Sequence, residues 1–102
     1  MATSPTVAQI DDVHARLARL RHDLESLIQR VSDGAMSLSQ VLALSEHDAT
    51  AQFVYLVKIA EAVPGVGKVR ARRALESLGY GERTRVGDVP LVRHAQLVDA
   101  LA

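Results

Sequence analysis

Basic side chains cluster directly after a glycine-containing turn in the second half of the chain. Glycine allows the main chain to approach a ligand closely, and the first amides of a helix have no intrahelical partners and carry a partial positive charge. A turn of this kind that leads into a basic helix is typical of a phosphate-binding site. The residues that we expect to form this site are Gly65, Val66, Gly67, Lys68, Arg70, Arg72 and Arg73.

The alternative is that these basic residues form an ordinary solvated helix surface. Basic side chains are unfavourable beside the positive end of a helix dipole, and few acidic residues lie close to them in the sequence. A cluster placed against this preference indicates that an anion binds there, so we favour the phosphate site. A second, polar turn adds three further candidates, which are Arg83, Thr84 and Arg85.

The distribution of charge along the chain indicates which kind of ligand binds. The 102 residues carry 12 basic and 12 acidic side chains, so the net charge is zero. Residues 66–85 hold six basic side chains against two acidic ones, whereas residues 1–65 hold five against eight. One basic pole on a neutral chain predicts electrostatic docking of a nucleic acid through a single face. The aromatic content of 3% leaves few rings for stacking unpaired bases, which favours double-stranded DNA over single strands.

The composition argues against several other classes of protein. The chain has no cysteine, its four histidines are scattered, and no carboxylates are placed for catalysis, so we expect no metal, no cofactor and no enzymatic activity. The longest apolar run is too short to span a bilayer, and the N-terminus lacks the basic and then apolar pattern of a signal peptide. A cytoplasmic protein without a membrane partner is therefore predicted.

A long amphipathic helix is expected first, over Ala8–Ser32. Its apolar residues recur at alternating steps of three and four, which is the a/d spacing of a coiled-coil seam. The seam consists of Ile10, Val13, Leu17, Leu20, Leu24, Leu27 and Val31. Either the helix lies along the rest of the chain, or it pairs two chains in a dimer. We favour the first interpretation, and hence a monomer, because the seam is short for a stable two-stranded coil.

Start and stop signals then predict shorter helices. A capping-box pattern begins a helix over residues 37–45. A third helix, capped by Asp48 or Thr50, is expected to end before Pro64, because the residue before a proline is pushed out of the helical region. The fourth helix is expected over residues 68–78.

The last helix is expected to be capped by Asp88. The helical spacing of apolar residues predicts a core made of Leu38, Val41, Leu42, Phe53, Leu56, Val57, Ala60, Val63, Ala71, Ala74, Leu75, Leu78, Val92, Leu97, Val98 and Leu101. The predicted fold class is all-α, with about five helices. Residues 1–34 form the long N-terminal helix with a frayed start, and residues 35–102 form a compact domain whose last two helices are joined by two turns.

Two parts of the sequence resemble known proteins. The stretch from Pro64 to Asp88, and particularly Gly65–Ala71 followed by Thr84–Val89, resembles the helix-two-turns-helix module of ribosomal protein S13 and of formamidopyrimidine-type DNA glycosylases. The stretch Ser37–Leu42, behind a long first helix, is similar to the actinobacterial integration host factors. The resemblance extends from Ser37 to the C-terminal residues.

This resemblance implies a small nucleoid-associated protein that binds duplex DNA with little sequence preference and bends it. It also implies a role in site-specific phage recombination, with an integrase-type recombinase as partner. By position, the main chain of Gly65–Gly67 with Lys68 would clasp phosphates. Arg70 and Arg73 would flank them, and Arg85 would correspond to an arginine of the second turn. The chain departs from the family in its neutral charge and its acidic N-terminal region.

Two alternatives from other classes stay open. An RNA-binding, ribosome-associated role would suit the S13-like module, and preference for structured RNA over duplex DNA would support it. A protein-interaction module built on the Ile10–Val31 seam is the other, and a change of Leu17 and Leu24 to charged residues would expose any dimer.

Overall fold

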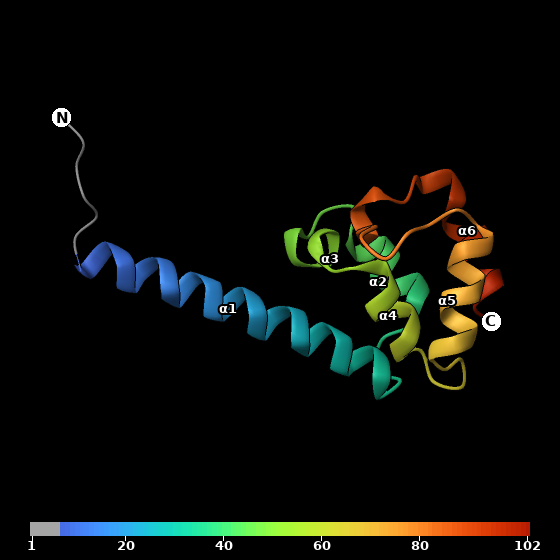
Figure 1. The fold of residues 1–102 in the computed structure, drawn as a ribbon, viewed down its shortest axis with the longest axis horizontal. Coiled ribbons are helices and arrows are strands. Elements are labelled where there is room, and N and C mark those ends of the chain that lie inside the picture. The colour runs from blue at the N-terminus through green and yellow to red at the C-terminus, as the bar shows by residue number, and fades with distance from the viewer. Residues whose placement is uncertain (1–6) are drawn as a thin grey trace.

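The computed structural model describes residues 7–102, with the side chains of residues 13–102, and this part of the chain consists of helices joined by turns and short extended segments (Figure 1). The helices in chain order are α1 (Val7–Ser32), α2 (Leu38–Leu44), α3 (Ala49–Phe53), α4 (Leu56–Ala62), α5 (Lys68–Ser77), the two 3₁₀ helices η1 (Val86–Asp88) and η2 (Leu91–Arg93), and α6 (His94–Ala100). The predicted all-α class is confirmed, with six α-helices in the described residues rather than about five.

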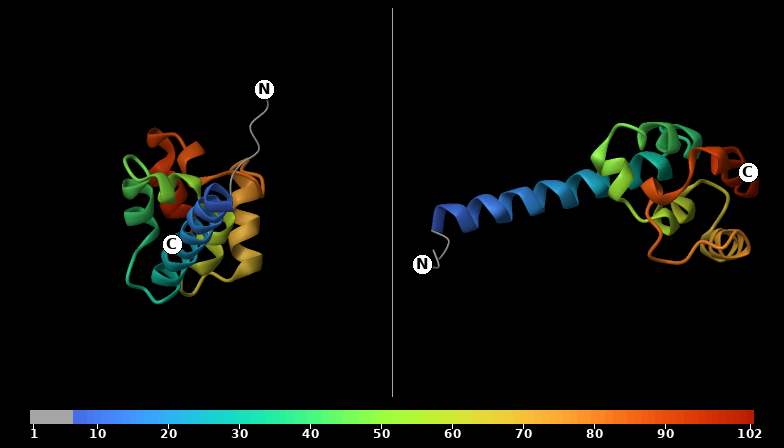
Figure 2. Two further views of the ribbon diagram at one scale, coloured as in Figure 1. Left: turned by 90° about the vertical axis from the view of Figure 1, so that its left-hand side faces the viewer. Right: turned by 90° about the horizontal axis from the view of Figure 1, so that it is seen from above.

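Helix α1 projects away from a compact group formed by the other helices, which gives the molecule principal extents of 53, 29 and 25 Å (Figures 1 and 2). Its C-terminal part packs on α3 and α4, and Leu27 and Val31 are buried there. Val13 is 51% exposed and Leu17 is 55% exposed. The prediction that α1 lies on the rest of the chain therefore holds for its C-terminal part, and the side chain of Ile10 lies outside the described residues.

The compact group is built around one hydrophobic core. Leu42, Leu56, Ile59 and Leu97 are its largest fully buried side chains, and Val31 from α1 joins them. The predicted capping box is present at the start of α2. The Ser37 hydroxyl accepts from the main-chain amide of Gln40 at 3.1 Å, and the side-chain Oε1 of Gln40 accepts from the main-chain amide of Ser37 at 2.8 Å. Two of the unpaired amides at this helix start are thereby satisfied.

The predicted third helix is wrong, because it is broken into α3 and α4. Val54 and Tyr55 have extended main chains between the two helices. The Val86 amide donates to the Val54 carbonyl at 2.9 Å, and the Leu56 amide donates to the Thr84 carbonyl at 2.9 Å. These contacts with the second turn replace helical hydrogen bonds. Phe53, which was expected in the core, is 45% exposed at the end of α3.

The predicted cap of the last helix is also wrong. The carboxylate of Asp88 accepts from the Arg85 amide at 2.9 Å within η1, so it is not available to α6. Pro90 then has an extended main chain, and η2 intervenes before α6 begins at His94. Val92 lies on η2 and is 90% exposed rather than part of the core.

Gly87 lies where the second turn touches α3, and its replacement tests this contact. A Cβ atom at Gly87 would lie 3.0 Å from the Gln52 Cβ and 3.1 Å from the Gln52 carbonyl oxygen. Gly87→Ala is therefore expected to lower the free energy of unfolding by about 1–3 kcal/mol, measured by urea denaturation. Gly81→Ala is the matched control, because a Cβ atom there meets nothing within 4 Å. Equal stability of the two variants would contradict the contact.

Candidate nucleic-acid interface

The glycine turn leads into α5 in a conformation that requires its two glycines. Gly65 has φ +84° and Gly67 has φ +77°, in the left-handed region that side chains disfavour. Val66 between them is buried, and its amide donates to the Val63 carbonyl at 3.2 Å, which anchors the turn to the core. Gly67 is the N-cap of α5 and provides no side-chain cap. The first amides of α5 are therefore open at the helix end with the positive dipole.

A shallow hollow lies over this helix start. The residues that line it are Val66, Gly67, Lys68, Val69, Arg70, Arg73, Ala74 and Ser77. We call it the α5 hollow. The structure thus brings together five residues of the predicted site around one concave surface, which are Val66, Gly67, Lys68, Arg70 and Arg73. It adds Val69, which is 66% exposed. Open amides and three basic side chains around one hollow suit an anion.

Arg70 has a second contact besides its place in the hollow. Its guanidinium donates to the main-chain oxygen of Ala102, which holds the residues after α6 beside α5. Arg70 therefore contributes to the packing of the chain as well as to the charge of the hollow.

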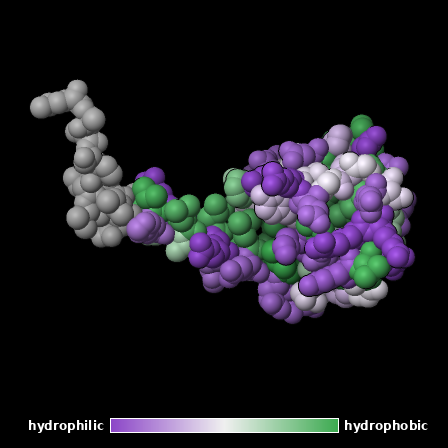
Figure 3. Space-filling view, viewed as in Figure 1, coloured by the Kyte–Doolittle hydropathy of each residue, from purple (hydrophilic) through white to green (hydrophobic). Residues whose placement is uncertain are grey.

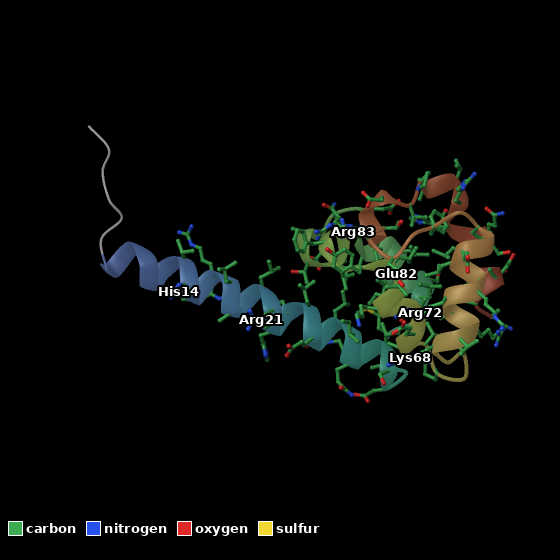
Figure 4. The ribbon with its side chains drawn as sticks, in the orientation of Figure 1. His14, Arg21, Lys68, Arg72, Glu82 and Arg83 are labelled. Carbon is green, nitrogen blue, oxygen red and sulfur yellow. The ribbon has the colours of Figure 1, made fainter. Side chains whose placement is uncertain are left out.

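Arg72 lies on the other side of α5 and has acidic partners. Its guanidinium Nε lies 2.8 Å from Glu61 Oε1, and Nη1 lies 3.2 Å from Glu82 Oε1 (Figure 4). The hydrogen bond and the charge of Glu61, followed by the charge of Glu82, raise the pKa of Arg72 above its usual value. Because the Glu61 side chain is only 8% exposed, it needs a charged partner. The sequence predicts few acidic residues near these basic side chains. This prediction is wrong for Arg72, which pairs with two glutamates.

The second turn carries Arg83, Thr84 and Arg85. The Arg85 guanidinium lies 3.7 Å from the centre of the Phe53 ring and 4.8 Å from the centre of the Tyr55 ring. It also donates to the Phe53 carbonyl at 2.8 Å. Arg85 therefore packs the second turn against the break between α3 and α4. Arg83, by contrast, is exposed.

The sequence did not indicate the partners Phe53, Tyr55 and Glu61. They lie between 11 and 32 positions from the arginines that they contact, so no local pattern links them. The one local signal for such a contact is that Phe53 and Tyr55, two of the three aromatic residues of the sequence, lie two positions apart.

In the described part of the chain, no three histidine, cysteine, aspartate or glutamate side chains gather closely enough to hold a metal ion. No helix within the described range combines the length and hydrophobicity needed to cross a bilayer.

Two turns between α5 and α6, with open amides and basic side chains at the start of α5, define a small all-helical protein of the helix-two-turns-helix class. Residues 31–99 match the family described as S13-like H2TH domain, and the chain belongs to this family. The predicted resemblance is confirmed.

Two relatives extend the comparison. The chain is 30% identical over 71 residues to a protein named Integration host factor from Streptomyces coelicolor, a match that covers 70% of this chain and 66% of the relative. A solved structure of sIHF bound to an 8bp palindromic DNA is similar with a TM-score of 0.78 and 26% sequence identity, and this match covers 86% of this chain and 99% of that one.

Proposed function

We propose that this protein binds double-stranded DNA through the phosphate backbone, with little dependence on sequence. The observation that carries the proposal is the uncapped start of α5, which opens into a hollow lined by Lys68, Arg70 and Arg73. Main-chain amides and basic side chains are the groups that bind phosphate without reading bases. The similar protein sIHF, which was solved with DNA, supports duplex DNA as the ligand.

The predicted site residues have different roles in this proposal. Gly65, Val66 and Gly67 shape the turn, while the amides of the two glycines and the Lys68 side chain clasp a phosphate group. Arg70 and Arg73 flank that phosphate. Arg83 and Thr84 of the second turn approach a neighbouring phosphate. Arg72 balances Glu61 and Glu82, and Arg85 positions the second turn.

The proposal extends to how the protein acts on DNA in the cell. Contacts from two turns at once favour DNA that can deform to meet both, so we expect the duplex to bend on binding. This is an architectural rather than an enzymatic role, exercised in the cytoplasm on the nucleoid. The relationship with integration host factors supports an integrase-type recombinase as a further partner. Energy transfer between dyes at the two ends of a duplex measures the bend.

The salt dependence of binding tests the proposal directly. Fluorescence anisotropy with a duplex of about 20 base pairs is expected to show that the logarithm of the binding constant falls with the logarithm of the salt concentration with a slope of roughly −4. Four basic side chains would each neutralise a DNA phosphate and release its counterion, namely Lys68, Arg70, Arg73 and Arg83. A slope near zero would contradict the electrostatic account. Tighter binding of structured RNA in competition would favour the RNA-binding alternative.

A pair of alanine variants separates the roles of the two arginines in the second turn. Arg85→Ala is expected to lower the free energy of unfolding by about 1–2 kcal/mol, because it removes the contacts with two aromatic rings and a carbonyl. The salt slope of DNA binding should not change. Arg83→Ala is expected to do the opposite, with unchanged stability and a slope about one unit shallower. A shallower slope for Arg85→Ala would give that side chain a phosphate contact instead.

A further inference from the structure

The α5 hollow contains an exposed apolar side chain among its basic ones. Val69 lies between Lys68 and Arg70 in the first turn of α5, lines the hollow with them, and is 66% exposed. Figure 3 shows a small hydrophobic patch over the start of α5, surrounded by hydrophilic side chains. The core gains little from a side chain so exposed, and valine is a weaker helix former than unbranched residues. Neither packing nor helix stability therefore explains a valine at this position.

The place of Val69 on the helix indicates which part of a bound strand it meets. Successive residues of an α-helix are rotated by about 100° around its axis, so Lys68 lies on one side of Val69. Arg70 and Arg73 lie on its other side, and Arg73 is the neighbour of Val69 on the next turn. Basic side chains on both sides suit two successive phosphates of one strand. Because successive phosphates are joined through a sugar, that sugar would lie over Val69.

The sugar is the part of the strand that distinguishes DNA from RNA. Phosphate contacts alone do not make this distinction, because both nucleic acids carry the same phosphates. Deoxyribose has a methylene group at C2′, which the methyl groups of valine can cover, whereas ribose has a hydroxyl group there. A hydroxyl covered by methyl groups loses water and gains no hydrogen bond in exchange, which disfavours RNA.

The other polar side chains of the hollow do not compensate for this loss. Ser77 lies two turns beyond Val69, about 12 Å along the axis at about 1.5 Å per residue, and the basic side chains would be engaged with phosphates. We propose that Val69 is a specificity-determining residue that packs on deoxyribose between two bound phosphates and selects DNA over RNA. This inference rests on the proposed binding of duplex DNA.

Binding of two duplexes of one sequence, made of DNA and of RNA, tests the proposal. Fluorescence anisotropy gives the ratio of the two dissociation constants, and the wild-type protein is expected to bind DNA about tenfold more tightly. Val69→Thr keeps the shape of the side chain but replaces a methyl group with a hydroxyl that can bond to ribose, so this preference should fall about fivefold. The two duplexes differ in helical form for every variant alike, so a change in the ratio reports the sugar contact.

Val92→Thr is the matched control for this result. It makes the same change at a valine that is 90% exposed on η2, outside the hollow, and it should leave the ratio unchanged. Val69→Ala is a second variant, which should also lower the preference for DNA, because water can then reach the ribose hydroxyl. Far-ultraviolet circular dichroism of each variant shows that its helices are intact.

The outcomes separate this proposal from the proposed function. Salt-dependent binding of DNA with a ratio that neither change at Val69 alters would overturn the role of Val69 alone. Tighter binding of RNA than of DNA by the wild type would overturn it as well. Binding of neither duplex would overturn the proposed function and this inference together.

Discussion

Replacement of Arg70 and Arg73 by glutamate is expected to weaken binding to a duplex of about 20 base pairs by roughly 30-fold or more at about 150 mM salt. Both side chains line the α5 hollow beside the open amides of the helix start. Each phosphate contact that is lost forfeits the release of about one counterion, and the two new carboxylates also repel the backbone. The salt slope should become shallower by about two units. Fluorescence anisotropy over a salt series measures both quantities.

The control variant makes an equal change in net charge at a different place in the chain. Arg19→Glu with Arg21→Glu alters the net charge equally, but these residues lie on the projecting part of α1, where Figure 4 labels Arg21. We expect a small loss of affinity and an unchanged slope. Equal losses from the two double variants would mean that net charge alone governs binding and that the α5 hollow has no special role. Circular dichroism is needed for the Arg70 change, because its guanidinium also contacts Ala102.

Leu56→Ala is expected to produce the largest loss of stability. The Leu56 side chain is 0% exposed at the start of α4, where the break after α3 meets the second turn. Truncation would leave a cavity in the core and should lower the free energy of unfolding by about 3–5 kcal/mol. For a domain of this size, the melting temperature should fall by roughly 15–30 °C, measured by thermal denaturation followed by circular dichroism.

The same substitution at Leu91 provides the comparison. Leu91 lies on η2 and is 66% exposed, so Leu91→Ala removes the same atoms from a side chain with few buried contacts. Its effect should stay within about 0.5 kcal/mol. A loss at Leu56 as small as that at Leu91 would show that the core at the start of α4 is less tightly packed than the structure indicates.

Features that depend on neighbours in the sequence could be predicted. The capping box at Ser37, the glycine turn and the start of α5 at Lys68 follow from local preferences, and the structure has all three. The class of ligand could also be inferred from the sequence, because charges crowded within one segment stay together in any fold. Arg70 and Arg73 line the same hollow because residues three positions apart lie on the same face of a helix.

Features that depend on distant residues could not be predicted. Residues 49–62 have the apolar spacing of one helix, and the break at Val54 exists because the main chain of residues 84–86 offers competing hydrogen bonds. Tertiary contacts override helix propensity in this way when they satisfy the same groups. Arg72 looks like a phosphate ligand in the sequence, and only the fold brings the nearly buried Glu61 within 2.8 Å of it.

The length of helix α1 sets the distance between its N-terminal end and the compact group. Its 26 residues make a rod of about 39 Å, comparable with one full turn of a DNA duplex. The C-terminal part of the rod packs on α3 and α4, and the rest leads away from the end of the compact group that carries the α5 hollow (Figure 1). With DNA at the α5 hollow, as proposed, whatever contacts the far end of α1 is held away from that DNA. A cross-linker of short reach attached to DNA should therefore capture residues beside Gly67 and miss those near Val13.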